Sequence, residues 1–313
     1  MHLFELCDTA PPHASESVPE WTLGCFRRRC ITFFTGAEDT QTEVLWLQSR
    51  GLTADFRRAP GTAKAPSARS FGDLSSEELL SLSRVEAGLS RTRHDGTLMS
   101  WSGWASFQLH ARWPEPGRLE RVGNCLVEHA PSGAYVEDWR FEPAGAGPLI
   151  GLSLIDERDV ETGEVLHRGG GLVVCGRHAA FVRGRPQPLP EGGRLEDFVR
   201  AHLGDPTQLA QAFAFDAAYA TRAPGASDDS DYTVSLATLP WRAGQALLGL
   251  GGFSRGEHGL VMKRVEEAGR SLERRFEVDT LEREFGAGVA TPATPAAARW
   301  LEREGDALLA TSR

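Results

Sequence analysis

Short runs of alternating polar and apolar residues, separated by glycine and proline, limit most strongly how this chain can fold. The longest run extends from Thr97 to Trp113, and it predicts either one long strand or two strands joined by a bend at Gly103. Segments rich in glycine and proline cannot continue a central strand, so the stretches between the runs are interpreted as loops. The whole pattern is typical of an antiparallel β protein.

Shorter segments complete this interpretation. Residues 43–57 predict a hairpin, and residues 124–129 and 134–141 predict two further strands joined by a turn. Residues 73–78 combine a capping residue with an acidic first turn, which favours a helix start. Residues 294–309 open with Thr-Pro followed by good helix formers, so they predict a C-terminal helix. The expected fold class is therefore mainly β, with short helices and a helix at the C-terminus.

The second half of the chain repeats the order of features in the first half. Phe56, in the return strand of the first hairpin, finds a counterpart in Phe181, and Phe141 finds one in Phe276 after a similar interval. A brief helical segment follows the hairpin in each half. We therefore expect two antiparallel β-barrels related by internal duplication, because closing a sheet removes its exposed edges.

The expected boundaries follow from loops rich in glycine and proline. Residues 1–18 predict an N-terminal arm, residues 19–145 a first barrel and residues 146–285 a second barrel. Residues 286–313 predict a tail that carries the C-terminal helix.

Four segments of the first half resemble a known family. They are the strand at 44–48, its return at 54–57, the segment 101–103, and the segment 135–139 with the sequence Tyr-Val-Glu-Asp-Trp. Together they are similar to tandem lipocalin-like proteins of fungi and bacteria, which have two β-barrels related by duplication and include a fungal protein-kinase interactor. The resemblance implies two lipocalin-like barrels. It concerns the fold and implies no catalytic residue.

Composition excludes several classes of function. The formal net charge is -9, which argues against a general nucleic-acid binder, and the one basic run, at residues 27–29, is short. No apolar run is long enough to span a membrane, and the N-terminus lacks the basic region of a signal peptide. We therefore expect a cytoplasmic protein that binds neither nucleic acid nor membranes.

The cysteines and the glycine-rich segments offer no site for a metal or a cofactor. The five cysteines are odd in number and scattered, without the Cys-x-x-Cys spacing of zinc sites. The Gly-Gly-Gly segment at 169–171 precedes a strand rather than opening a helix, so it predicts a turn and not a dinucleotide-binding loop. The expected protein has no bound metal and no cofactor, and it is a monomer or a weak dimer.

One strand combines a carboxylate with aromatic rings. Period-two alternation over 134–141 places Tyr135, Glu137 and Trp139 on one face. If that face lines a barrel interior, burial raises the pKa of the Glu137 carboxyl and makes it a candidate acid or base. If the face points outward, Glu137 is only a charge at the rim of the barrel.

Other candidate residues share faces with suitable neighbours. His110 is a second candidate acid or base, and Trp104 lies on the same polar face of its strand. Trp104, Tyr135 and Trp139 are candidates for ligand contact. Two pairs on the hairpin are the others: Trp46 and Gln48 combine an aromatic ring with an amide, and Asp55 and Arg57 combine a carboxylate with a guanidinium. For each of these residues a purely structural role is the alternative.

Three functions remain open. A barrel of about eight strands holds one small ligand, so the first hypothesis is a carrier or binder of a small, partly apolar molecule in the first barrel. The second is a cofactor-independent isomerase, cyclase or dehydratase that uses an acid or base inside the barrel. The third is a protein interaction module in which side chains fill both barrels. The second barrel is expected to be mainly structural.

Overall fold

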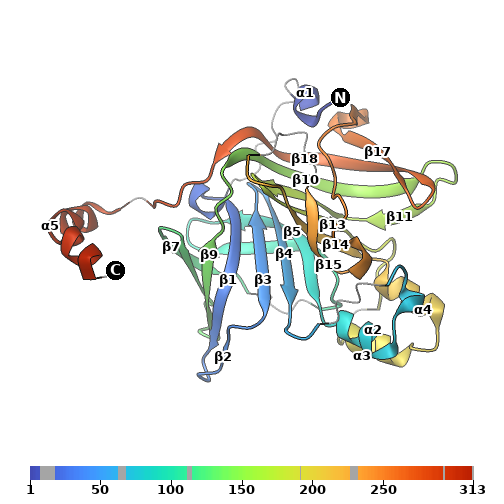
Figure 1. Ribbon diagram of the computed structural model, residues 1–313, viewed down its shortest axis with the longest axis horizontal. Coiled ribbons are helices and arrows are strands. Elements are labelled where there is room, and N and C mark those ends of the chain that lie inside the picture. Colours follow the sequence, from blue (N-terminus) through green and yellow to red (C-terminus); the bar gives the residue numbers. More distant parts are fainter. Residues whose placement is uncertain are drawn as a thin grey trace.

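The computed structural model describes residues 1–7, 18–62, 68–110, 115–190, 192–225, 232–291 and 293–311. Within these residues the chain forms two nine-stranded antiparallel sheets, one from each half of the chain (Figure 1). The last strand of the first sheet ends at Phe141, and the second sheet begins at Ala146. The predicted mainly β fold is confirmed.

The first sheet has the strand order β6-β5-β4-β3-β1-β9-β8-β7, with β2 beside β1. Its strands are β1 (Gly24–Phe33), β2 (Glu38–Asp39), β3 (Glu43–Gln48), β4 (Leu52–Arg58), β5 (Glu86–His94), β6 (Met99–Ser106), β7 (Arg118–Val122), β8 (Cys125–His129) and β9 (Tyr135–Phe141). The predicted hairpin is β3–β4, and the two strands predicted after it are β8 and β9. The long strand expected up to Trp113 ends at Ser106, and Trp113 lies outside the described residues.

The second sheet has the order β15-β14-β13-β12-β10-β18-β17-β16, with β11 beside β10. Its strands are β10 (Ala146–Asp159), β11 (Val165–Arg168), β12 (Gly170–Cys175), β13 (His178–Arg183), β14 (Asp216–Thr221), β15 (Thr233–Ala237), β16 (Phe253–Arg255), β17 (Val261–Glu267) and β18 (Arg270–Gly286). Each strand of the second sheet therefore has the same place as the strand of the first sheet whose number is lower by nine; β10, for example, corresponds to β1. The two sheets share one strand order.

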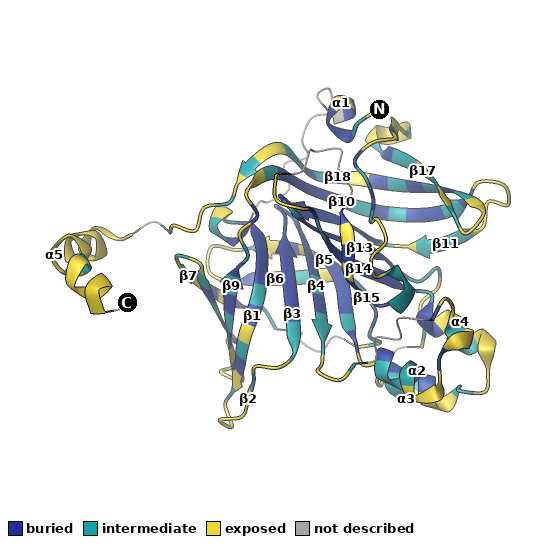
Figure 2. Ribbon diagram, in the orientation of Figure 1, coloured by how far each residue is buried: buried dark blue, intermediate teal, exposed yellow. Residues whose placement is uncertain are grey.

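The helices are short except for the last. They are α1 (Leu3–Cys7), α2 (Ser76–Leu82), α3 (Leu195–Ala201), α4 (Pro206–Phe213) and α5 (Pro295–Thr311), with 3-10 turns η1 (Glu20–Thr22), η2 (Phe71–Asp73), η3 (Pro240–Arg242) and η4 (Glu257–Gly259). Ser75 caps α2, and the Thr294 hydroxyl accepts a hydrogen bond from the Ala297 N–H at the start of α5. Helix α5 has no buried residue and lies apart from both sheets (Figures 1 and 2).

The first sheet curls into a half-barrel whose two edges meet at one point. Met99, at the start of β6, and Gly117, beside β7, exchange two backbone hydrogen bonds of 2.8 Å. The curl gives the sheet a concave side, but only half of the barrel that we expected is formed.

The second sheet is not closed, in contrast to the closed or nearly closed barrel that we expected. The N-terminus lies against the edge strand β16, because Phe253 exchanges two backbone hydrogen bonds with Met1. Leu3, Phe4 and Leu6 are buried in the apolar core of the second half. Helix α1 thus contributes three side chains to this core, and residues 8–17 lie outside the described part of the chain.

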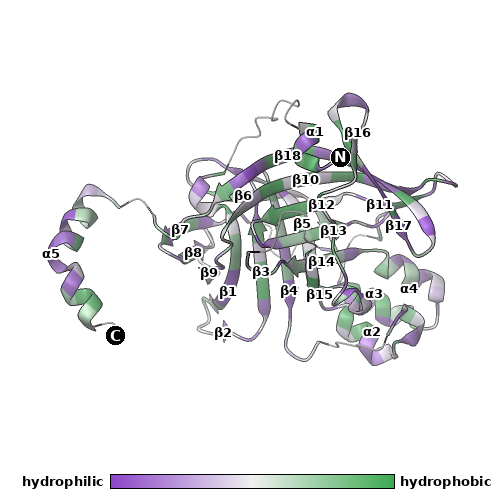
Figure 3. Ribbon diagram, turned by 45° about the horizontal axis from the view of Figure 1, so that its top comes forward, coloured by the Kyte–Doolittle hydropathy of each residue, from purple (hydrophilic) through white to green (hydrophobic). Residues whose placement is uncertain are grey.

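The two halves share a second apolar core between their sheets. Side chains of β3 and β4 pack there against side chains of β12 and β13, and the cluster combines Leu45, Leu47 and Ala54 with Val173, Cys175 and Val182. Figure 2 shows the central strands of both sheets buried, and Figure 3 shows hydrophobic residues gathered in the same strands. The halves are therefore packed onto each other. None of the described helices is long and apolar enough to cross a membrane.

Candidate functional site

A cavity of about 510 Å³ lies in the first half-barrel, and most candidate residues from the sequence line it. Its described lining includes Trp46, Asp55, Arg57, Trp104, His110, Tyr135, Glu137 and Trp139. Of the nine candidates, only Gln48 is not part of the lining. The side chains come from β3, β4, β6, β9 and the segment after β6, so alternation along separate strands brings them to one place.

Gln48 supports the cavity wall from behind. Its side-chain oxygen accepts hydrogen bonds from Trp46 Nε1 at 3.2 Å and from the Thr53 hydroxyl, and its amide nitrogen donates to backbone oxygens. Gln48 is fully buried. Its amide therefore fixes the orientation of Trp46 and is not available to a ligand.

Three tryptophans form an aromatic cluster at the cavity. The ring of Trp46 lies 5.5 Å from that of Trp139 and 6.5 Å from that of Trp101, both edge to face. Strict alternation predicts Trp101 and Trp104 on opposite faces of β6, yet both line the cavity. The pairing register of β6 shifts between them, at Gly103, whose φ is +64°. This irregularity adds Trp101 to the site.

Two arginines hold Glu137 inside the cavity. Arg28 donates a hydrogen bond of 2.7 Å to the Glu137 carboxylate, and Arg57 Nη1 lies 3.7 Å from the same oxygen. Arg57 also donates to Asp55 at 2.9 and 3.1 Å. Glu137 is 2% exposed, which contradicts the alternative that it is a charge at the rim.

Glu128 on β8 is a buried carboxyl that was not among the residues predicted from the sequence. It lies directly across the ladder from Glu137, and the Tyr135 hydroxyl donates to it at 3.3 Å. Burial and then the neighbouring Glu137 raise the pKa of Glu128 to about 8, against the opposing effect of Arg57. A turn of three residues at 131–133 would pair Glu128 with Val136. The observed pair with Glu137 requires a four-residue loop, 131–134, which the sequence pattern did not specify.

The second half of the chain supplies part of the cavity wall. Arg168 and the segment 184–189 line the cavity beside the residues of the first half. Arg185 fixes this segment by donating hydrogen bonds to the backbone oxygens of Ser106, Phe107 and Ala212. Burial lowers the pKa of Arg185 to about 10, so it stays charged at neutral pH. The sequence offered no signal for this long-range contact.

His110 lies in the lining but is exposed. Its Nδ1 is 3.0 Å from the backbone oxygen of Gly193. A ring at an open position is poorly placed to exchange protons with a molecule held among the tryptophans. The geometry therefore favours the carboxyl pair over His110 as the proton-transferring group.

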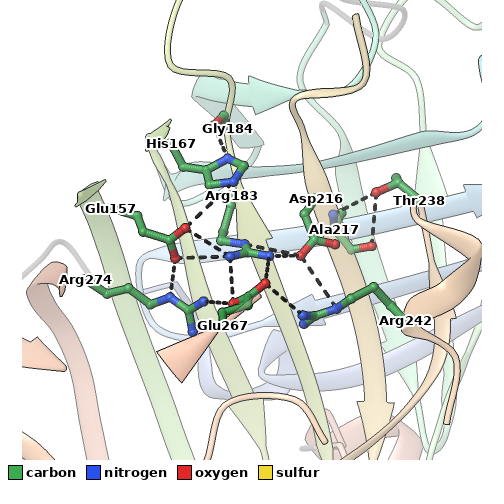
Figure 4. Close-up of polar contacts among 10 residues, drawn as sticks. All are labelled: Glu157, His167, Arg183, Gly184, Asp216, Ala217, Thr238, Arg242, Glu267 and Arg274. Atoms are coloured by element: carbon green, nitrogen blue, oxygen red, sulfur yellow. Dashed lines mark hydrogen bonds and ion pairs between the residues drawn. The ribbon is translucent and has the colours of Figure 1, made fainter. Parts of the chain in front are cut away.

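The corresponding interior of the second half holds a network of charges instead. Arg183 lies at its centre and forms ion pairs with Glu157 at 3.0 Å, Asp216 at 2.6 Å and Glu267 at 3.0 Å (Figure 4). Burial alone raises the pKa of Glu267, but Arg183 and its neighbours outweigh this effect and lower it to about 2. The charged groups of this network are therefore paired with one another.

The two interiors share one arginine position. The hairpins β3–β4 and β12–β13 both turn through two-residue loops, and, counted from these loops, Arg57 and Arg183 occupy the same place. Each pairs across the ladder with an acidic residue of the next strand, Glu86 and Asp216 respectively. The halves thus agree in this cross-strand polar pair as well as in strand order, although the pair is buried in the second half and only partly buried in the first.

One further motif lacks the context that its chemistry needs. Residues 252–256 read Gly-Phe-Ser-Arg-Gly, the spacing of the nucleophile elbow of α/β-hydrolases. That chemistry requires the serine on a sharp turn between a strand and a helix. Ser254 instead lies exposed within β16, followed by a 3-10 turn. We assign it no catalytic role.

Comparison with known proteins gives no relative from which a function could be transferred. No family model, no curated protein and no solved structure matches the chain significantly. Among the described residues, no group of three or more His, Cys, Asp or Glu side chains is placed to hold a metal ion. The function must therefore be inferred from the cavity itself.

Proposed function

We propose that the first half of this protein binds a small, partly apolar molecule in its cavity, as a carrier or binder. The observation that carries the proposal is the cavity of about 510 Å³ lined by Trp46, Trp101, Trp104 and Trp139. Sites for small molecules commonly measure about 300–1,000 Å³ and combine apolar walls with a few polar groups. A cavity of this size also disfavours the hypothesis of a protein interaction module with filled barrels.

A cofactor-independent enzyme is the second candidate, and the carboxyl pair favours it. Glu128 keeps its proton at neutral pH because its pKa is raised to about 8, while Glu137 is held by Arg28 at 2.7 Å. Two carboxyls in contrasting surroundings are typical of acid–base sites. Glu128 is the group that would protonate a bound molecule, which suits an isomerisation, cyclisation or dehydration.

We also propose that the halves are lipocalin-like units that arose by duplication, and that the second half is mainly structural. The common strand order and the matching positions of Arg57 and Arg183 support the duplication. The ion pairs of Arg183 with Glu157, Asp216 and Glu267 support a structural role, because these charges are already paired.

Recovery of a bound molecule tests the binding proposal. Protein purified under native conditions is denatured, and released small molecules are identified by mass spectrometry. Ser106 lines the cavity, so Ser106→Trp places a large side chain in the binding space, whereas Val160→Trp changes an exposed position of the second half. We expect the same molecule from the wild type and Val160→Trp, and none from Ser106→Trp. Equal recovery from all three proteins would contradict a site in this cavity.

A further inference from the structure

We infer that the ligand of this cavity is uncharged, and that its apolar body carries an oxygen acceptor, such as a ketone or ester carbonyl, for the indole N–H groups of Trp101 and Trp139. The inference rests on the proposed binding function and specifies the chemical class of the ligand. It depends on two independent features of the cavity, the state of its hydrogen-bond donors and the balance of its charges.

The donors are two indole groups. Trp101 Nε1 and Trp139 Nε1 are buried and have no hydrogen-bond partner among the described residues. Trp46 differs, because its Nε1 donates to Gln48. A buried donor without a partner costs free energy, so native proteins keep few such donors unless another molecule accepts from them. Both rings line the cavity, where a bound molecule would supply the acceptor.

The charges of the described lining balance. It carries three guanidinium groups, those of Arg57, Arg168 and Arg185, and four carboxyl groups, those of Asp55, Glu86, Glu128 and Glu137. Glu128 is neutral at pH 7 because its pKa is raised to about 8. The three positive charges then equal the three negative ones in number. Arg28, which bonds Glu137 from outside the lining, does not change this balance because Asp39 pairs with it at 3.0 Å.

An ionic ligand does not fit this balance. A carboxylate or ammonium group would bring an uncompensated charge into a space with low polarity, and the cost of removing that charge from water is large. An uncharged ligand avoids this cost. Its hydrocarbon part gains from contact with the tryptophan rings.

Glu128 offers a third donor at neutral pH. The charged and titratable groups that act on it are Glu137, Arg57 and Asp55, together with the hydroxyl of Tyr135. While protonated, the Glu128 carboxyl donates to the same kind of oxygen acceptor as the two indoles. Above about pH 8 it becomes an anion and would repel a carbonyl oxygen, so binding of the ligand should weaken there.

Three probes with the same hydrocarbon chain test the charge requirement. Methyl decanoate is uncharged with an ester oxygen, decanoate is an anion and decyltrimethylammonium is a cation at pH 7. Titration calorimetry with the full-length protein measures the affinity of each. We expect methyl decanoate to bind at least about tenfold more tightly than either ion. Tighter binding of decanoate or decyltrimethylammonium would overturn the inference and leave the proposed binding function intact. Failure of all three to bind would contradict the proposed function itself.

Proton NMR of the indole N–H groups tests the acceptor requirement. Trp101→Phe and Trp139→Phe variants assign the two resonances, and Trp46, whose N–H is already bonded to Gln48, serves as the internal control. Methyl decanoate should move the Trp101 and Trp139 resonances downfield and leave that of Trp46 nearly unchanged. Binding of the ester without a downfield shift at Trp101 or Trp139 would show that the indoles do not recognise an oxygen, and would overturn the inference.

Discussion

Two glutamates on neighbouring strands have opposite surroundings within the same cavity. Glu137 is bonded to Arg28, whereas Glu128 has no arginine within ion-pair distance among the described residues and keeps a raised pKa of about 8. Between about pH 4.5 and pH 8 the native protein therefore holds a proton that the unfolded chain releases, and its stability falls as the pH rises through that window.

Replacing Glu128 should remove this pH dependence. Glu128→Gln keeps the shape and cannot ionise, so we expect the variant to exceed the wild type in free energy of unfolding by at least about 1 kcal/mol at pH 9, and to differ little near pH 4.5. Urea denaturation across this pH range measures the effect, with the exposed Glu120→Gln as control. If the free energy of unfolding depends on pH in the same way in Glu128→Gln and in the wild type, the pKa of the Glu128 carboxyl is not raised in the folded protein.

Glu137→Gln should have the opposite effect on stability. The substitution removes the more buried of the two carboxylates that pair with Arg28 and leaves only the half-buried Asp39, so the cost should approach about 3–5 kcal/mol, which is typical of breaking a buried ion pair. Asp138→Asn is the matched control, because its pair with Arg140 is much more exposed and should cost less than about 1 kcal/mol. If both substitutions lower the free energy of unfolding by the same amount in urea denaturation, the buried pair of Glu137 with Arg28 contributes no more to stability than the exposed pair.

At the scale of single elements, alternation predicted most of the site but not its irregular parts. It placed Tyr135, Glu137 and Trp139 on one face of β9, because an undistorted strand has a fixed period. It failed at β6. A bend at Gly103 was one of the two expected arrangements, but alternation did not indicate that the shifted register there brings both Trp101 and Trp104 to the cavity. Local distortions of this kind depend on pairing with the next strand, which a single sequence does not reveal.

Gly103 should be necessary for the geometry of β6. Its φ of +64° lies in the left-handed region, so Gly103→Ala should cost about 1–2 kcal/mol, although nothing crowds the added methyl group. We also expect a change in the intrinsic tryptophan fluorescence, since Trp101 and Trp104 flank this point. Gly204→Ala, at an exposed position without positive φ, is the control. A variant as stable as the control would indicate that β6 adopts another register.

The segment 184–189 shows a second kind of element that alternation could not place. It belongs to the second half but lines the cavity of the first, held by Arg185. Arg185→Met removes the hydrogen bonds to three backbone oxygens, so amide hydrogen exchange in 184–189 should accelerate by about tenfold or more. Arg200→Met removes only an exposed pair with Glu196 and should leave this exchange unchanged. Unchanged protection in Arg185→Met would show that other contacts fix the segment.

At the scale of the whole molecule, the sequence predicted the two halves but not how they meet. The spacing of Phe56 and Phe181 indicated a repeat, although the hairpin loops align Phe181 with Asp55 instead, one residue away. The open second sheet was not predictable, and neither was the contact of its edge strand β16 with Met1 at the far end of the chain. Closure or opening of a sheet is decided by such long-range partners, and local patterns carry no information about them.

The shared core between the sheets leads to a last prediction, on cooperativity. Leu3 is completely buried in the core of the second half, so Leu3→Ala should lower the free energy of unfolding by about 2–5 kcal/mol. Because β3 and β4 pack directly on β12 and β13, the loss should lower the stability of both halves together. Tryptophan fluorescence, to which the first half contributes six of the eight tryptophans, and far-ultraviolet circular dichroism should then report one transition, displaced to lower urea. Leu309→Ala, exposed on α5, is the matched control and should unfold like the wild type. If Leu3→Ala instead gives two separate transitions, with the tryptophan signal at its original midpoint, the halves fold independently and the shared core does not couple them.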